Sequence, residues 1–243
     1  MLLWLLLDGV AQAQSVAPDA GQVVADLVGN DPSAGMSTSV RLLLFLTGLT
    51  FLPALIVVMT PFVRFVVVLS LLRQALGLQQ SPPNQVIIGV SLILTMLVMQ
   101  PVLQESWTMG VGPFMDGQME LSPAIDAMME PWREFMLANT RRAEMAAILD
   151  IAQIERPETL EEIPTTAVIS SYVLSELGTA FVIAVYVFIP FLVVDIIVSS
   201  ILLGMGMMML PPPLVSLPFK LLVFVLMDGW VLLIQDLAGG IAR

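Results

Sequence analysis

Four long and nearly uncharged apolar stretches constrain this chain more than any other feature. They run over residues 42–59, 86–103, 179–203 and 214–235. Each approaches or exceeds the roughly 17–25 residues that a helix needs to cross the hydrocarbon layer of a membrane. Apolar residues on every face at this length indicate membrane helices, whereas an outer-membrane barrel needs alternating segments of about ten residues. The sequence therefore predicts an all-α protein whose apolar surface is covered by lipid or by a large assembly.

The composition argues against several functional classes. Of the 243 residues, 58% are hydrophobic and 12% are charged, whereas soluble proteins have about 25% charged residues. The sequence contains no His and no Cys, so the commonest catalytic base, the commonest transition-metal ligand and disulfides are all missing. The net charge of −11 argues against nucleic-acid binding, because phosphate contacts need clustered Lys and Arg. We therefore expect a protein that is not an enzyme and binds no cofactor or metal.

The N-terminal residues are typical of a targeting segment. A short apolar run is followed by Ala-Gln-Ala, which predicts a signal peptide over residues 1–13 that is cleaved after Ala13. No Lys or Arg precedes the run, so an uncleaved apolar terminus is the alternative. Residues 14–40 are rich in Gly, Ala, Ser, Asp and Pro and predict a flexible linker. Residues 237–243 are expected to form a short C-terminal tail.

Residues 41–103 are expected to form a first helical hairpin. Thr60 and Pro61 are typical of an N-cap and a first helical turn, so they predict a break and a second helix. Gly77 is typical of the end of that helix. The Ser-Pro-Pro-Asn sequence at residues 81–84 then predicts the turn that leads into the second apolar stretch.

Residues 179–236 are expected to form a second hairpin, whose tip at residues 204–213 contains three consecutive prolines. Asp195 lies about 12 Å before this tip and Lys220 about 9 Å after it, at the helical rise of 1.5 Å per residue. The two charges can therefore form a pair within apolar surroundings. Such pairs usually fix register or the choice of partner, and a proton relay is the alternative.

The tip of the second hairpin is rich in methionine, at Met205, Met207, Met208 and Met209. Methionine is unbranched and polarizable, so a ring of these side chains can deform around varied cargo and close again. Simple packing against lipid or neighbouring helices is the alternative, and physical chemistry alone favours it.

Residues 104–178 are expected to form the acidic, water-exposed part of the chain. They carry 13 of the 20 acidic residues and four of the nine basic residues. Within them, residues 127–152 predict one or two amphipathic helices that begin near Ser122 and Pro123 and end at Arg156 and Pro157.

Basic residues near the apolar segments predict the orientation. Arg64 and Arg73 lie between the first two stretches with no acidic residue, so this part is expected to face the cytoplasm. The acidic region and both termini would then face the opposite side. Arg64 and Asp228 have no obvious partner within the chain. With Arg73 and Glu176, they are candidates for contacts between subunits.

Several longer motifs occur along both hairpins. The first hairpin carries Met-Thr-Pro-Phe-Val-Arg and Val-Leu-Ser-Leu-Leu-Arg-Gln-Ala-Leu-Gly, followed by Ser-Pro-Pro-Asn-Gln. Ser-Glu-Leu-Gly-Thr-Ala-Phe precedes the third stretch, and Met-Gly-Met-Met-Met-Leu-Pro-Pro, Ser-Leu-Pro-Phe-Lys and Asp-Gly-Trp follow in the second hairpin. Together these motifs resemble the FliP family of flagellar biosynthetic proteins, and the resemblance covers residues 40–236. This chain differs from the family at three positions that usually hold polar residues, which are Pro61, Gly178 and Val182 here.

The resemblance implies a core subunit of the type III protein export gate in the flagellar basal body. Five copies would assemble with FliQ and FliR, next to FlhB and FlhA, into a ring around a channel. The assembly would lie in the bacterial inner membrane with its bulk toward the periplasm, and would pass unfolded rod, hook and filament proteins. The resemblance also implies a gasket role for Met207, Met208 and Met209, with Met205 beside them, and a charge pair between Asp195 and Lys220.

Three other functions remain open at this point. The first is the equivalent subunit of a virulence-type injectisome, which has the same physical properties and a different cargo. The second is a stand-alone membrane transporter, which would need a polar site within one chain, typically at broken helices in symmetric halves. The two hairpins differ in length, breaks and charge pattern, which argues against it. The third is a scaffold without a pore.

Overall fold

The computed structural model describes residues 38–155, 159–207 and 209–241. These residues form helices and no strand, which confirms the predicted all-α class for this part of the chain. The predicted signal peptide, its cleavage site at Ala13, most of the linker at 14–40, and Met208 lie outside the described residues. The chain divides into two units between Leu55 and Ile56, and each unit is described by itself.

Helix α3 spans Thr38–Val58, and its residues up to Leu55 belong to the first unit. The predicted break after it is confirmed, since α4 begins only at Phe62. Its chemistry differs from the expectation, because Pro61 itself occupies the N-cap position. The Thr60 hydroxyl instead donates to the carbonyl of Val57 at 2.8 Å, where it satisfies an acceptor at the end of α3.

The second unit is built around α9, a single helix of 40 residues over Thr165–Gly204. At 1.5 Å per residue this helix is about 60 Å long, roughly twice the thickness of a hydrocarbon layer. It begins 14 residues before the apolar stretch predicted at 179, so the expected boundary between residues 178 and 179 falls inside one helix. The buried face of the added part includes the polar residues Ser171, Ser175 and Glu176, which interrupt the apolar pattern of the sequence.

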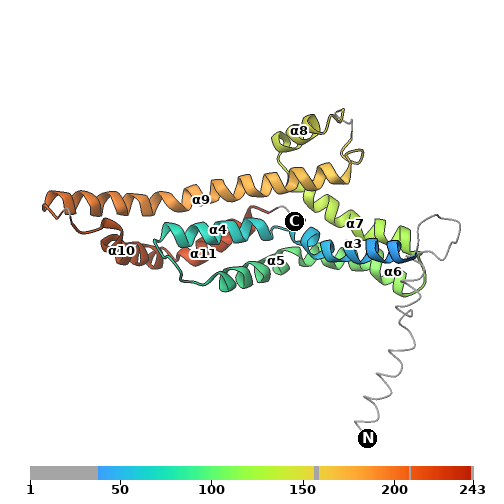
Figure 1. The fold of residues 1–243 in the computed structure, drawn as a ribbon, viewed down its shortest axis with the longest axis horizontal. Coiled ribbons are helices and arrows are strands. Elements are labelled where there is room, and N and C mark those ends of the chain that lie inside the picture. The colour runs from blue at the N-terminus through green and yellow to red at the C-terminus, as the bar shows by residue number, and fades with distance from the viewer. Residues whose placement is uncertain (1–37, 156–158, 208, 242–243) are drawn as a thin grey trace, which may run out of the picture. The chain divides into compact units, whose positions relative to one another are not determined.

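Two helices, α4 and α10, pack directly against the apolar part of α9, and each also contacts a further helix (Figure 1). Helix α4 (Phe62–Ala75) contacts both α9 and α5 (Asn84–Ser106), and α10 (Pro212–Leu226) contacts α9 and α11 (Gly229–Gly239). The fourth apolar stretch is therefore two helices, bent by 63°, and the sequence analysis did not predict this break. Gly77 has a φ of +78° and ends α4 as predicted.

The core of the second unit lies between α4 and α9. Phe65, Val68 and Leu72 of α4 are buried, as are Val168 and Tyr172 of α9. Burying each large apolar side chain contributes about 1.5–3 kcal/mol. Small buried residues on α9 let the neighbouring helices approach closely, as in membrane helix packing. These positions are Ser171, Ser175, Ala180 and Ala184.

The acidic region consists of a helical continuation of α5 and two further helices. Helix α5 runs on through the π-helical turn η1 (Trp107–Val111) into α6 (Gly112–Met115). Helices α7 (Leu121–Ala138) and α8 (Arg142–Ile151) confirm the two amphipathic helices predicted there. Helix α7 packs against η1 and α5, and α8 packs against α9.

Two continuous helical runs within the described residues are long and apolar enough to cross a membrane. They are Asn84–Met115 and Thr165–Gly204. The pairs α3 with α4 and α10 with α11 raise the number to as many as four, if each interrupted pair counts as one span. The four predicted apolar stretches are therefore all helical.

Candidate functional site

The two charges of the second hairpin form an ion pair near its tip. Lys220 Nζ of α10 lies 2.6 Å from Asp195 Oδ2 of α9, as the helical spacing predicted. The Ser216 hydroxyl donates to Asp195 Oδ1 at 2.6 Å. Lys220 also donates to the carbonyl oxygen of Ala75 at 3.1 Å, at the C-terminal end of α4. A cation is favourable there because the last carbonyls of a helix lack partners within it.

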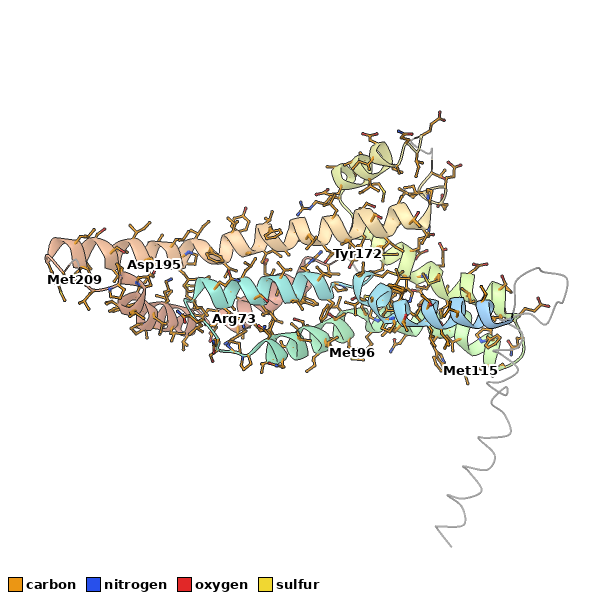
Figure 2. All side chains as sticks on the ribbon, in the orientation of Figure 1. Arg73, Met96, Met115, Tyr172, Asp195 and Met209 are labelled. Atoms are coloured by element: carbon orange, nitrogen blue, oxygen red, sulfur yellow. The ribbon has the colours of Figure 1, made fainter. Side chains whose placement is uncertain are left out.

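The cluster of Asp195, Ser216 and Lys220 joins three helices, α9, α10 and α4. The Lys220 side chain is 7% exposed and the Asp195 side chain 32% exposed, and Figure 2 shows Asp195 beside α10. The cluster therefore connects the arms of the second hairpin to the end of α4 in the first hairpin. A lysine with both a carboxylate and a helix carbonyl as partners favours a structural role over a proton relay.

The structure contains a second ion pair, which is fully buried and was not expected from the sequence. Arg64 of α4 donates through Nε to Glu176 Oε2 at 2.8 Å and through Nη2 to Glu176 Oε1. Arg64 Nη1 also reaches the carbonyl oxygen of Gly240 at 3.5 Å. Both charged side chains are buried, at 3% and 1% exposure. The expectation that Arg64 lacks a partner within its own chain is therefore wrong.

The pairing of Arg64 with Glu176 also weakens the argument for orientation. Glu176 belongs to the acidic region, which was assigned to the side opposite the basic residues of the first hairpin. Because the two groups are in contact, Arg64 lies with the acidic region and carries no signal for the cytoplasmic side. Arg73, near the other end of α4, is the basic residue on which that argument now depends (Figure 2).

Arg73 holds the turn of the first hairpin. Its Nη1 donates to the carbonyl oxygen of Pro82 at 3.0 Å and to Asn84 Oδ1 at 2.7 Å. These bonds fix the segment that joins α4 to α5. Arg73 therefore has partners within its own chain, and a contact with another subunit stays a prediction.

Tyr172 lies next to the buried ion pair, and its hydroxyl group makes no hydrogen bond with a described residue. Its side chain is fully buried, and its ring packs against Phe135 with centroids 6.0 Å apart. The hydroxyl oxygen has no hydrogen-bond partner among the described residues. A buried polar group without a partner costs free energy, so the hydroxyl is unfavourable at this position.

Replacing Tyr172 by phenylalanine should leave the chain as stable or stabilise it. The ring contacts remain, and an unpaired hydroxyl is removed, which predicts a gain of up to about 1 kcal/mol in the free energy of unfolding. Denaturant titration of the purified chain in detergent, followed by circular dichroism, measures this difference. A clear loss of stability would indicate that a bound water pairs the hydroxyl.

The methionine tip connects α9 to α10. Met205, Met207 and Met209 are exposed, and Met209 is 97% exposed at the far end of α9 (Figure 2). Gly206 has a φ of +74°, a conformation that favours glycine and that allows the chain to turn. The irregular tip expected over residues 204–213 agrees with the end of α9 at Gly204 and the start of α10 at Pro212. The tip thus presents flexible apolar side chains that are largely exposed.

Asp228 marks a bend that the sequence analysis missed. Its φ is +50°, and its carbonyl oxygen accepts the first backbone bonds of α11, from Val231 and Leu232. Asp is one of the few residues that tolerate this conformation. The ring of Phe224 lies so close to Gly229 that no side chain fits there, and it packs edge-on against Trp230. The Asp-Gly-Trp sequence was the available signal for this break.

The fold and these charge clusters define an all-helical, membrane-associated protein in which ionisable groups join the helices. The chain belongs to the FliP family, whose profile matches residues 45–237. The flagellar biosynthetic protein FliP of Bacillus subtilis strain 168 is 44% identical over 208 residues, which cover 86% of this chain and 94% of that protein. The FliP protein of Pectobacterium carotovorum is 48% identical, with 85% and 81% covered. That of Aquifex aeolicus is 44% identical, with 82% and 84% covered.

Proposed function

We propose that this chain is a core channel-forming subunit of the flagellar type III protein export gate. In this role it conducts unfolded rod, hook and filament proteins across the bacterial inner membrane. Membership of the FliP family over residues 45–237 is the observation that carries the proposal. The three relatives described above are flagellar biosynthetic proteins by name, which favours a flagellar role over an injectisome role.

The proposed working form is an oligomer of five copies with FliQ and FliR, in contact with FlhB and FlhA. The apolar surface of α9 supports an assembly or a lipid contact. Large side chains such as Tyr186, Ile189 and Ile196 are at least half exposed along it. Isolated chains rarely leave such continuous apolar surface uncovered. Asp228, which is exposed, is the strongest remaining candidate for a charged contact between subunits.

The protein's own work in this proposal is to build the conduit and to close it, not to catalyse a reaction. Energy would come from the proton gradient and a separate ATPase. The assembly would lie in the inner membrane at the flagellar basal body, with its bulk toward the periplasm. The long apolar helices α5 and α9 support the membrane location.

The methionine tip is proposed to seal the conduit. Met205, Met207, Met208 and Met209 would meet their copies from neighbouring subunits on a common axis. Replacing Met205, Met207 and Met209 together by alanine should widen this closure, because each change removes a flexible apolar side chain. We expect several-fold faster ion leakage through the assembled gate in cells, measured as loss of membrane potential. Swimming motility then reports export in the same strains.

The matched control for this experiment is Met115→Ala. Met115 is also an exposed methionine, but it lies in α6, at the opposite end of the second unit from the tip (Figure 2). This variant should keep both the membrane potential and motility. Unchanged ion leakage in the triple tip variant would contradict the gasket and favour a scaffold without a pore at this position. Normal flagella after deletion of the whole gene would contradict the export function itself.

A further inference from the structure

The backbone of the second hairpin is irregular in both arms at the same level. In one arm, Pro190 lies inside α9. In the other, the chain breaks between α10 and α11 at Asp228 and Gly229. Pro190 and Gly229 line the same apolar cleft, whose volume is about 320 Å³. The residues between these two points, 191–227, are called the tip arm below.

Both irregular points offer little resistance to bending. Proline has no backbone N–H, so at Pro190 the carbonyl oxygen of Tyr186 loses its partner within the helix, and the proline ring crowds that same carbonyl. Proline is one of the few causes of sharp bends in long helices. In the opposite arm, Asp228 has a φ of +50°, so the backbone has already left the helical conformation. A rotation at these two points therefore disturbs few helical hydrogen bonds.

The cleft leaves room for such a rotation. Its walls are apolar, with Val187 and Phe191 from α9 and with Phe224 and Leu232 from the opposite arm. Protein interiors normally contain few voids larger than a water molecule, so side chains beside an open cleft lack contacts on that side. These side chains can therefore shift with the tip arm without overlapping a neighbour.

Helix α4 supports α9 only up to the level of the cleft. Arg64, near the start of α4, pairs with Glu176 of α9, whereas Leu72, near the end of α4, lines the cleft together with Pro190. The two helices thus run in the same direction, and α4 ends at Ala75. Beyond this end, α9 continues toward the tip with α10 packed against it (Figure 1).

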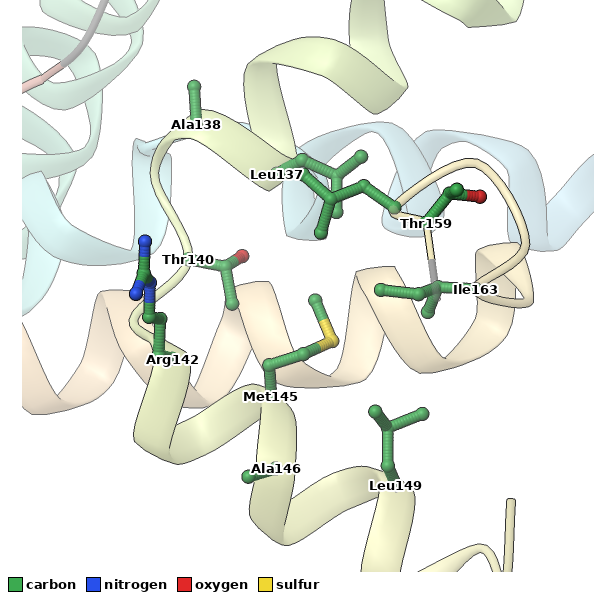
Figure 3. A pocket seen from close by; sticks show the side chains of 10 residues that line it. Leu137, Ala138, Thr140, Arg142, Met145, Ala146, Leu149, Thr159 and Ile163 are labelled. Atoms are coloured by element: carbon green, nitrogen blue, oxygen red, sulfur yellow. The ribbon is translucent and has the colours of Figure 1, made fainter. Parts of the chain in front are cut away.

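The opposite end of α9 is held from several sides. The Ser175 hydroxyl donates to the carbonyl oxygen of Asn139 at 3.2 Å and accepts from the backbone N–H of Arg141 at 3.1 Å. Arg133 of α7 donates to the carbonyl oxygen of Ile163 at 2.6 Å, just before α9 begins. Figure 3 shows the end of α7, helix α8 and this segment around a common pocket. Because α9 is anchored here, a bend at Pro190 moves the tip arm.

A hydrogen bond ties the tip arm to the end of α4. Lys220 donates to the carbonyl oxygen of Ala75 at 3.1 Å. Asp195 and Ser216, which bond to each other beside Lys220, belong to the tip arm as Lys220 does. A tilt of the tip arm away from α4 therefore breaks the bond between Lys220 and Ala75 but leaves the ion pair intact.

We propose that the second hairpin is hinged at Pro190 and at Asp228–Gly229, and that the bond between Lys220 and Ala75 latches the tip arm to α4. When this bond is broken, the tip arm tilts as one body and carries the methionine tip with it. The motion goes beyond the export-gate function, and distances within one chain test it whether or not that function holds.

Pulsed electron paramagnetic resonance, which measures the distance between two spin labels, tests the hinge. The chain contains no Cys, so Gln74→Cys with Ser200→Cys places one label on α4 and one on the tip arm, both at exposed positions. The full-length labelled chain is produced together with an excess of the unlabelled chain, so that distances within one copy dominate. Ser200 lies about 15 Å beyond Pro190, so a tilt of about 20° moves it by about 5 Å.

The label distance should respond to the latch and to the hinge in turn. With the latch intact, we expect a single distance. Lys220→Met with Asp195→Asn removes the bond to Ala75 without leaving an unpaired charge, and this double variant should add a second, longer distance. Pro190→Ala in the same background supplies the missing N–H of α9 and should reduce the longer component several-fold.

Two controls separate the hinge from a general change in the fold. Pro218 also lies inside a helix, but within the tip arm, so Pro218→Ala should leave the longer component unchanged. Labels at Gln74→Cys and Ser170→Cys, both outside the tip arm, should keep one distance in every variant and so report a folded chain.

Four results would overturn the proposal. The first is a longer component that is already present with the latch intact, and the second is a single unchanged distance in the double variant without the latch. The third is a longer component that persists with Pro190→Ala. The fourth is a longer component that Pro218→Ala suppresses as strongly as Pro190→Ala does.

Discussion

Replacing Arg64 by alanine should destabilise the chain by about 3–5 kcal/mol, because it leaves a buried carboxylate without its partner. Arg64 and Glu176 join α4 to α9 through two hydrogen bonds, and both side chains are almost fully buried. The desolvated Glu176 then loses the cation that is hydrogen-bonded to it. Denaturant titration of the purified chain in detergent, followed by circular dichroism, measures the change in free energy of unfolding.

The matched control is the double variant Arg64→Met with Glu176→Leu. It removes both charges and replaces them with apolar side chains of similar length, so no buried charge remains. Exchange of a buried ion pair for apolar residues is often neutral or stabilising. We therefore expect the double variant to recover most of the stability that Arg64→Ala loses. If the double variant is no more stable than the single one, lost packing and not the unpaired charge explains the effect.

The two ion pairs show how far the sequence could predict the site. Asp195 and Lys220 lie on the two arms of one hairpin, so helical rise and the position of the tip placed them at the same level. Arg64 and Glu176 are 112 residues apart, on helices that meet only through the packing of α4 on α9. No local spacing links such a pair, and without a partner Arg64 was interpreted as a contact between subunits.

The helix boundaries likewise fall into two groups. Some could be predicted from the local sequence, and others depend on contacts between helices. Length and apolar content predicted all four apolar stretches, and Gly77 predicted the end of α4. The start of α9 at Thr165 was missed because Ser171 and Ser175 interrupt the apolar run. In the structure these serines are buried and bonded, Ser171 to the carbonyl oxygen of Ala167 and Ser175 to that of Asn139. Polar residues whose bonds are satisfied within the fold therefore continue a helix that hydropathy alone would end.

Replacing Gly110 by alanine should destabilise the acidic region by about 3 kcal/mol, at the upper end of the usual cost of overpacking. Gly110 lies in η1, where this turn packs directly against α7. A Cβ at this position would come within 2.7 Å of the Ala124 carbonyl oxygen and 2.9 Å of the Met128 backbone nitrogen. Backbone atoms of α7 cannot rotate away as a flexible side chain can, so the two helices must separate. The loss is measured by denaturant titration as above, and by faster hydrogen exchange of amides in α7.

The same substitution at Gly89 should have the opposite sign. Gly89 lies in α5, earlier in the same continuous helical run, and a Cβ there meets no atom within 4 Å. Gly89→Ala should therefore stabilise the chain by about 0.5–1 kcal/mol, because alanine loses less backbone entropy than glycine in a helix. The difference between the two variants isolates the close contact of η1 with α7 from helix propensity, which favours alanine at both positions. Equal effects of the two substitutions would show that α7 does not press on η1 at Gly110.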